Sequence, residues 1–335
     1  MTSARAQLEA IDIPADDTVI IFRTQTSGVR GRLVRLGAAV DDILTPHAAP
    51  QIVSEALGEA LVLAALTGSV LKSEGQVIFQ TRTNGAISFL VADYQAPGQL
   101  RGYARFDAQA LDRAGAAPDS VQAPGVVQAL GDGHLAMTIS EGPESERYQG
   151  VMVLDGAPLP AATAEYFEQR EALPTFARAA VAQHYSAAGA ALSSDARPSW
   201  RWRAGGIMIQ SLELGRDGLS EGAMGKAAED WARVRMLAST IEDHELLDPQ
   251  LPSARLLLRL FHEEGVIVER TVSLRAQCRC SRERIAGVLT SFGAKELVDM
   301  QDERGQVSVT CEFCTAVYAF QLSEIGEPLH EPEPR

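Results

Sequence analysis

The sequence is short of cysteine, and all four of its cysteines lie between positions 278 and 314 of 335 residues. A secreted protein stabilised by disulfides would carry more of them, spread along the chain. Clustered thiols in a chain of this size are typical of a reducing compartment, where cysteines bind metal or undergo redox chemistry. The sequence therefore predicts a cytoplasmic protein with one thiol-based site.

Positive charge and long apolar runs are also scarce. The chain has 30 Lys and Arg against 44 Asp and Glu, a formal net charge of −14, which argues against a general binder of nucleic acid or anionic membranes. The most apolar stretch, residues 60–71, is too short to span a bilayer. Residues 1–14 lack the basic start and apolar core of a signal peptide. We expect neither nucleic acid nor membrane among the partners.

Apolar residues are plentiful, at 46% of the chain, and a chain of this length is expected to hold two or more domains. Helical periodicity over residues 51–72 predicts a buried central helix. Two β-rich runs, 77–83 and 86–92, flank Asn84-Gly85, which favours a type I′ hairpin because both turn residues need positive φ. The fold class is therefore α+β, with a mixed α/β core and a large, mainly antiparallel sheet.

Further β-rich runs and one helix extend this core. Strands are predicted at 18–22, 31–34, 100–106, 135–140, 150–154 and 204–212, and a helix at 161–170. Residues 174–185 fit strand or helix, and residues 186–203, rich in Ala, Ser and Gly, suggest a surface insertion. Gly205-Gly206 is not part of a phosphate-binding motif, because neither GxGxxG nor GxxxxGK[ST] surrounds it. A bulge or a close strand contact is favoured there.

The composition changes after residue 213, which predicts four segments. They are an α/β core at 1–213, a helical linker at 214–270, a small C-terminal domain at 271–325 and a disordered acidic tail at 326–335. Two linker helices are expected, 227–247 and 253–264, the second with Ser253 as its N-cap. The apolar residues of these helices include Trp231, Val234, Leu256, Leu257, Leu260 and Phe261. Permanent packing on the core is the ordinary interpretation, and binding of another protein stays open because a docked face can later be exposed.

The cysteines form two local pairs, Cys278-Arg-Cys280 and Cys311-Glu-Phe-Cys314, with thirty residues between them. Two such pairs are the usual way to build a closed tetrahedral Zn²⁺ site. We expect all four thiolates to bind one Zn²⁺ per chain in the reduced state. A closed site leaves no position for a substrate, so hydrolytic zinc catalysis is not expected and the protein is not predicted to be an enzyme.

Three roles compete for this site. A purely structural zinc ribbon that binds nucleic acid or protein is the simplest, but the C-x-C pair is unusual for one. Each pair is also close enough in sequence to form its own disulfide and expel the metal. Nucleic-acid binding is disfavoured because residues 271–325 carry six Lys and Arg against seven Asp and Glu. A thiol oxidoreductase using Cys311 and Cys314 lacks the preceding strand–helix context. A redox switch is the third role.

The sequence resembles the heat shock protein 33 family of redox-regulated chaperones. The C-terminal match rests on Cys278-Arg-Cys280-Ser-Arg-Glu-Arg284, Cys311-Glu-Phe-Cys314 and Tyr318-Ala-Phe320. Family-like segments also occur in order along the chain at 29–33, 101–105, 145–150, 205–210 and 260–264. The insertion at 186–203, with Trp200 and Trp202, and the acidic tail depart from the family pattern.

The resemblance implies an ATP-independent holdase that binds unfolding proteins under oxidative stress. It implies an inactive form that is reduced and zinc-bound, and an active form with Cys278–Cys280 and Cys311–Cys314 disulfides and no zinc. It further implies a metastable linker, a homodimer in the oxidised state and client binding to residues exposed from the linker. The six apolar residues named above are the candidates for that role.

Overall fold

The computed structural model describes residues 16–72, 74–115, 125–142, 145–186, 199–215 and 220–325. The chain divides into two compact units between Ala276 and Gln277. The segment 1–14, the tail 326–335 and most of the expected insertion at 186–203 lie outside the described residues. The end of that expected insertion is strand instead, because Trp202 is buried in the core and Trp200 packs edge-on against Tyr185 at 5.4 Å.

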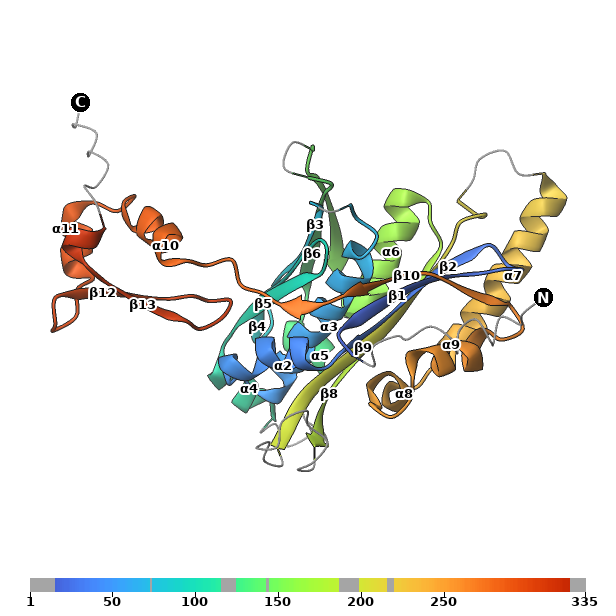
Figure 1. Ribbon diagram of the computed structural model, residues 1–335, viewed down its shortest axis with the longest axis horizontal. Helices are drawn as coiled ribbons and strands as arrows, with labels where there is room; N and C mark the ends of the chain where they lie inside the picture. Colours follow the sequence, from blue (N-terminus) through green and yellow to red (C-terminus); the bar gives the residue numbers. More distant parts are fainter. Residues whose placement is uncertain are drawn as a thin grey trace. The chain divides into compact units, whose positions relative to one another are not determined.

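Two β-sheets build the N-terminal unit (Figure 1). The five-stranded sheet has the order β10-β1-β2-β9-β8, and the six-stranded sheet has the order β11-β5-β4-β3-β6-β7. The first contains β1 (Thr18–Thr24), β2 (Val29–Leu36), β8 (Thr175–Ser186), β9 (Ser199–Ser211) and β10 (Val266–Ser273). The second contains β3 (Gln76–Thr83), β4 (Ile87–Gln95), β5 (Gln99–Phe106), β6 (Gly133–Ser140), β7 (Tyr148–Leu154) and β11 (Arg275–Ala276). Among the described strands only the β11–β5 pair is parallel, which confirms the α+β class with mainly antiparallel sheet.

Helix α3 (Gln51–Gly68) is the centre of the core, as the periodicity predicted. Its buried side chains share one cluster with apolar residues of both sheets. By length and composition α3 could cross a membrane, but 78% of its apolar window is buried inside the protein, as expected of a core helix. The other helices around this core are α2 (Ala38–Leu44), η1 (Thr45–His47), α4 (Ala108–Gly115), α5 (Val126–Leu130) and α6 (Leu159–Glu171).

The β3–β4 hairpin forms as predicted, but its turn is not type I′. Neither Asn84 nor Gly85 is among the described residues with positive φ, and Arg82 pairs with Phe89, which leaves a connection longer than two residues. The turn is shaped by a neighbouring segment instead. Asn84 exchanges hydrogen bonds with Asp132, and a Cβ on Gly85 would lie 2.3 Å from the carbonyl oxygen of Leu130. Tertiary contact therefore overrides the local turn preference.

Three helices follow the five-stranded sheet: α7 (Glu221–Ser239), α8 (Asp243–Leu247) and α9 (Ser253–Phe261). The single helix expected over 227–247 is wrong, because the chain breaks after Ser239 and restarts behind a capping box formed by Glu242 and Glu245. The predicted cap of α9 is also wrong. Pro252 precedes the helix, and Ser253 is its first residue and is buried.

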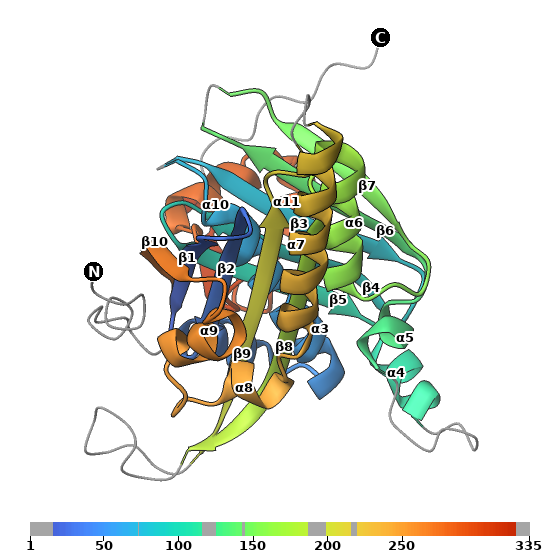
Figure 2. The same ribbon diagram turned by 90° about the vertical axis from the view of Figure 1, so that its right-hand side faces the viewer.

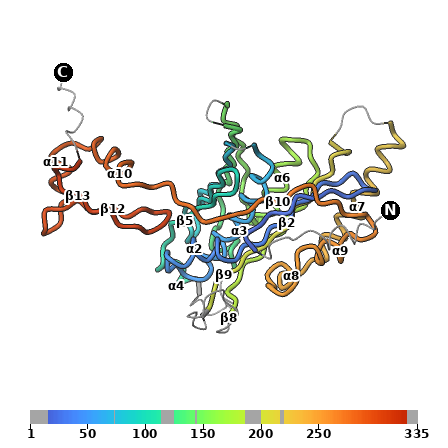
Figure 3. The backbone as a smooth tube through the Cα atoms, viewed as in Figure 1, coloured from blue at the N-terminus to red at the C-terminus, as the bar shows by residue number. Residues whose placement is uncertain are grey.

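These three helices cover the face of the five-stranded sheet that points away from α3. Successive strand residues point to opposite faces, so Ile20 packs under the three helices and Ile21 packs in the α3 core. Figure 2 shows α7 lying along β8 and β9. Strand β10 then continues from α9 and pairs with β1 at the sheet edge, as the tube in Figure 3 traces.

The Gly205-Gly206 pair lies inside β9, with continuous pairing on both sides. A Cβ on Gly206 would lie 2.4 Å from Val62 of α3, and one on Gly205 would lie 2.6 Å from the carbonyl oxygen of Leu246 in α8. The expected close contact is confirmed, and it involves a different helix on each face of the sheet.

The C-terminal unit is small. It contains α10 (Arg282–Leu289), α11 (Ala294–Asp299), a hairpin of β12 (Gln306–Thr310) and β13 (Val317–Gln321), and η2 (Leu322–Glu324). Its buried apolar core consists of Leu289, Leu297, Val307, Phe320 and Ile325. A core of this size supplies little hydrophobic stabilisation. The C-terminal unit therefore needs another source of stabilisation to stay folded.

Candidate metal centre

The structure brings the four predicted cysteines together in the C-terminal unit. Cys278 and Cys280 lie just before α10, and Cys311 and Cys314 lie in the turn between β12 and β13. Their four Sγ atoms are all within 4.8 Å of one another. The turn is closed by hydrogen bonds from the Cys311 amide to the Ala316 carbonyl at 2.9 Å and from the Thr315 amide to the Cys311 carbonyl at 2.8 Å.

The sulfur geometry suits a tetrahedral ion. The Sγ atoms of Cys278 and Cys311 are 3.7 Å apart, and those of Cys280 and Cys314 are 3.4 Å apart. Zn–S bonds of about 2.3 Å in a tetrahedron would place neighbouring sulfurs about 3.8 Å apart. All four cysteines are free thiols and half-buried. Soft thiolate ligands in this arrangement fit zinc, so this cluster could hold one metal ion.

The thiols differ in acidity. Burial raises the pKa of Cys278 and also that of Cys314. Burial acts in the same direction on Cys280, but hydrogen bonds, first from Tyr318 and then from the other thiols, lower the pKa of Cys280 to about 7. The Tyr318 hydroxyl lies 3.3 Å from the Cys280 sulfur, and this hydrogen bond raises the pKa of Tyr318 to about 12. Of Cys278, Cys280 and Cys314, Cys280 therefore most readily becomes a thiolate, the reactive form.

Sequence reasoning gave Tyr318 no role, although it lies only four residues after Cys314. Arg282 was expected from the sequence only to offset part of the negative charge of the thiolates, together with Arg279 and Arg284, and the structure gives it further contacts. Its guanidinium donates hydrogen bonds to the Ala319 carbonyl at 2.8 Å and to Glu324 at 2.9 Å, and it stacks 4.4 Å from the centre of the Phe320 ring. Arg282 thereby connects α10, which follows the first cysteine pair in sequence, to β13, which follows the second.

The six apolar candidates of the linker helices also lie together. All of them are buried in one cluster with apolar residues of the sheet, and none is more than 9% exposed. Phe261 packs against Phe22 of β1 with ring centres 5.7 Å apart. In this conformation these side chains stabilise the docked helices and offer no surface to another protein.

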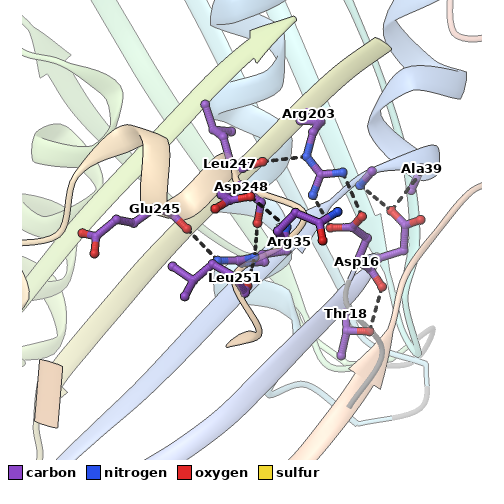
Figure 4. A network of polar contacts seen from close by, with 12 residues as sticks. Asp16, Thr18, Arg35, Ala39, Arg203, Glu245, Leu247, Asp248 and Leu251 are labelled. Carbon is purple, nitrogen blue, oxygen red and sulfur yellow. Dashed lines mark hydrogen bonds and ion pairs between the residues drawn. The ribbon is translucent and has the colours of Figure 1, made fainter. Parts of the chain in front are cut away.

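A buried arginine of the sheet binds the segment between α8 and α9 (Figure 4). Arg35 on β2 is 1% exposed. Its guanidinium donates to the backbone carbonyl oxygens of Glu245 at 2.6 Å, Asp248 at 2.8 Å and Leu251 at 2.5 Å. Burial lowers the pKa of Arg35, and these acceptors compensate for the lost water. We call this contact the Arg35 latch.

Arg203 supports the same segment from the neighbouring strand β9. It donates to the Leu247 carbonyl at 2.7 Å, and it forms a paired contact with the carboxylate of Asp16 that includes a bond of 2.8 Å. Figure 4 shows the Arg35 and Arg203 side chains side by side, facing the α8 end. The sequence of β2 and β9 contains several arginines, and the strand pattern does not show which of them are buried or which partners they bind.

An ion pair fixes α7 to the end of α9. Arg233 donates to Glu264 at 2.7 Å and to Asp230 at 2.7 Å, and the Thr26 hydroxyl of the β1–β2 turn donates to Glu264 at 2.8 Å. Glu264 is buried. The hydrogen bond from Arg233 is the main cause that lowers the pKa of Glu264 to about 2.

The fold and the site define a class of protein: a two-sheet α+β core covered on one face by helices, followed by a small unit that carries a four-thiol centre. The sequence model described as Hsp33 protein matches residues 17–321. The chain therefore belongs to the Hsp33 family of chaperones. It is 41% identical over 303 residues to the 33 kDa chaperonin of Caulobacter vibrioides, covering 90% of this chain and 94% of that one.

Further relatives agree with this family. The 33 kDa chaperonin of Salmonella typhimurium is 32% identical over 324 residues, covering 96% of this chain and 98% of that one. The crystal structure of the 33 kDa chaperonin (heat shock protein 33 homolog) of Thermotoga maritima matches with a TM-score of 0.69. That match covers 92% of this chain and 96% of the other at 21% identity, so it shows a common fold.

Proposed function

We propose that this chain is a redox-regulated, ATP-independent holdase of the cytoplasm that binds unfolding proteins and prevents their aggregation. The observation that carries this proposal is the assembly of four free thiols within 4.8 Å in a chaperone of this family. The reduced form, with Cys278, Cys280, Cys311 and Cys314 around one Zn²⁺, is inactive. The form with two disulfides and no zinc is active and dimeric.

The bound ion would crosslink the two halves of the C-terminal unit and supply folding free energy. Zinc binding contributes on the order of 10 kcal/mol in small domains, which is comparable with the whole stability of a typical domain. With only a small buried core, the C-terminal unit, residues 277–325, would unfold without it. The purely structural alternative predicts this dependence on zinc too, but it predicts no change of activity on oxidation.

Peroxide would convert the thiolate ligands of each cysteine pair to a disulfide in two steps. A thiolate attacks the peroxide oxygen, forms a sulfenic acid and releases one water after proton uptake. The second thiol of the pair then displaces the sulfenic oxygen as a second water and forms the disulfide. One peroxide is consumed for each disulfide. The low pKa of Cys280 makes this thiol a good target for attack by peroxide, although its strained ring with Cys278 is expected to close after the Cys311–Cys314 disulfide.

The chain connects this centre directly to the helices that cover the sheet. Strands β10 and β11 lead from α9 to Cys278 without another helix between them. We propose that unfolding of residues 271–325 withdraws support from the metastable linker, residues 214–270, because short helices are marginal without packing. Its release would expose the six apolar candidates and the sheet face beneath them. Exposed apolar area of this kind binds unfolding proteins.

Hydrogen exchange during peroxide activation tests this order of events. Exchange should rise first in 271–325 and then in 227–264, while the β3–β4 hairpin stays protected. Holdase activity on an aggregating client, measured in the same samples, should follow the second phase. Full activity with residues 227–264 still protected would contradict the mechanism.

A further inference from the structure

A cavity of about 440 Å³ opens in the N-terminal unit, and none of its lining residues belongs to the buried cluster under the linker helices. It lies where the segment after α3, the β4–β5 turn and strand β10 meet. Its volume is in the range of small-molecule sites, about 300–1,000 Å³. No role described so far uses this cavity.

The charge of this cavity is opposite to that of the protein. Three cationic residues line it, Lys72 from one wall and Arg270 and Arg275 from the other, and no described lining residue is acidic. The chain as a whole has a formal net charge of −14. A cleft lined by one sign of charge concentrates ligands of the other sign, so the occupant is expected to be an anion.

Arg270 is held in a position to receive such an anion. It lies on β10, opposite Ile21 of β1, and its Nη2 donates to the Ser69 carbonyl oxygen at 2.7 Å. This bond uses one of the five N–H donors of a guanidinium, and the planar group matches phosphate oxygens in pairs. The Lys72 ammonium has no hydrogen bond or ion pair to another residue that the structure describes.

The other side of the cavity is apolar. Leu71, Val272 and the ring of Tyr94 contribute to the lining. Tyr94 is 1% exposed and fixed by packing, since a Cβ on Gly68 would lie 2.2 Å from its ring. Burial raises the pKa of Tyr94 to about 12, so its hydroxyl stays protonated. That hydroxyl has no hydrogen bond to another described residue and remains available as a donor.

We propose that this cavity binds a small phosphate monoester with a flat apolar group. The phosphate contacts Lys72, Arg270 and Arg275, and the apolar group lies on Leu71 and Val272, which are both partly exposed. The proposal concerns the reduced, folded chain and does not rest on the redox mechanism. Release of residues 214–325 on oxidation would remove the wall that carries Arg270 and Arg275.

Isothermal titration of the full reduced chain with phenyl phosphate tests the proposal. One molecule should bind per chain, inorganic phosphate should bind more weakly, and phenol should not bind. Lys72→Glu and Arg270→Glu should each lower the affinity about tenfold or more, since each removes charge-assisted contacts. Arg113→Glu is the matched control, because it makes the same change of charge at an exposed position of α4 that does not line the cavity.

Lys72→Glu decides the matter if Arg270→Glu fails to fold, because the exposed Lys72 side chain makes no hydrogen bond or ion pair within the part of the chain that the structure describes. Unchanged affinity in Lys72→Glu would overturn the proposal. An equal loss in Arg113→Glu would show only a general effect of charge and would overturn it as well. Phenol that binds as tightly as phenyl phosphate would remove the assignment to an anion.

Discussion

Arg35 donates a hydrogen bond across 2.8 Å to the backbone carbonyl oxygen of Asp248, joining a buried strand to the segment after α8. The guanidinium donates to carbonyls at and beyond the end of α8, where the helix itself supplies no donors. The Asp248 carbonyl also accepts a hydrogen bond from the Leu251 amide at 3.3 Å. Undocking of the helices would leave Arg35 on an exposed apolar sheet, where water replaces its three acceptors. The latch therefore favours the docked state without blocking the released one.

Removing the latch should make the linker easier to release. Arg35→Met should lower the free energy of docking by on the order of 3 kcal/mol, because a charged donor to buried carbonyls is lost. Urea unfolding combined with hydrogen exchange of residues 243–251 measures the effect. Arg23→Met on β1 is the control. Among the described residues the Arg23 side chain forms a solvent-exposed ion pair with Glu269 at 3.7 Å, and its loss should cost about 0–1 kcal/mol. Equal effects of the two variants would refute the latch.

Because of Glu264, docking of the linker helices should become weaker as the pH falls. Its folded pKa is about 2 against an ordinary value of 4.5. The stabilisation is therefore fully present above the higher value and is lost as pH falls towards the lower one. Glu264→Gln should be less stable than the unmodified protein at neutral pH, by on the order of 2–3 kcal/mol.

The stability difference between the two proteins should shrink as the pH is lowered below about 4.5. Urea titrations at several pH values measure it, and the comparison cancels the other carboxylates. Glu263→Gln is the neighbouring control, because that side chain is 80% exposed. If the stability difference between the unmodified protein and Glu264→Gln does not change with pH, the Arg233–Glu264 ion pair is not its cause.

The reduced protein should hold one Zn²⁺ per chain, because four thiolates complete one tetrahedral shell. A Cys311→Ser, Cys314→Ser double variant should lose the metal, and Ser308→Ala on the exposed side of β12 should keep it. Metal analysis and thiol titration, before and after treatment with peroxide, measure the zinc content and the number of free thiols per chain. Full zinc content in the double variant would remove the assignment.

Oxidation should join Cys278 to Cys280 and Cys311 to Cys314. In the assembled centre the Cys278 and Cys311 sulfurs are 3.7 Å apart and those of Cys280 and Cys314 are 3.4 Å apart, so the predicted pairing competes with two other short sulfur contacts. The Cys278–Cys280 ring is tight and should close second. Peptide mapping along a peroxide time course checks both the pairing and the order. A majority of 278–311 or 280–314 links would contradict them.

Sequence reasoning was most successful where the information is local. The apolar period of residues 51–72 predicted helix α3, and the short spacing within each cysteine pair predicted the four-thiol cluster. Both patterns are visible within a short stretch of sequence. Segment 174–185 stayed undecided, since its alanines fit either structure until β9 pairs along it.

The failures share a physical cause. The Asn84 turn is set by Asp132, and the latch joins Arg35 to carbonyls more than 200 residues further along the chain. Such partners are fixed by the tertiary fold and leave no pattern in a short window. The break after Ser239 did have a local signal, the Glu242–Glu245 capping box, which helical periodicity alone does not detect.

Gly205 and Gly206 are adjacent in sequence, but substitutions at the two positions should have different effects: one on folding of the core and the other on docking of the linker. A side chain at Gly206 would collide with α3, so mutants should be removed because they fail to accumulate as folded protein. A side chain at Gly205 would collide with α8 alone, so mutants should fold but release the linker without an oxidant. A saturation scan scored separately for cellular abundance and for holdase activity in unstressed cells should place the two codons in different classes.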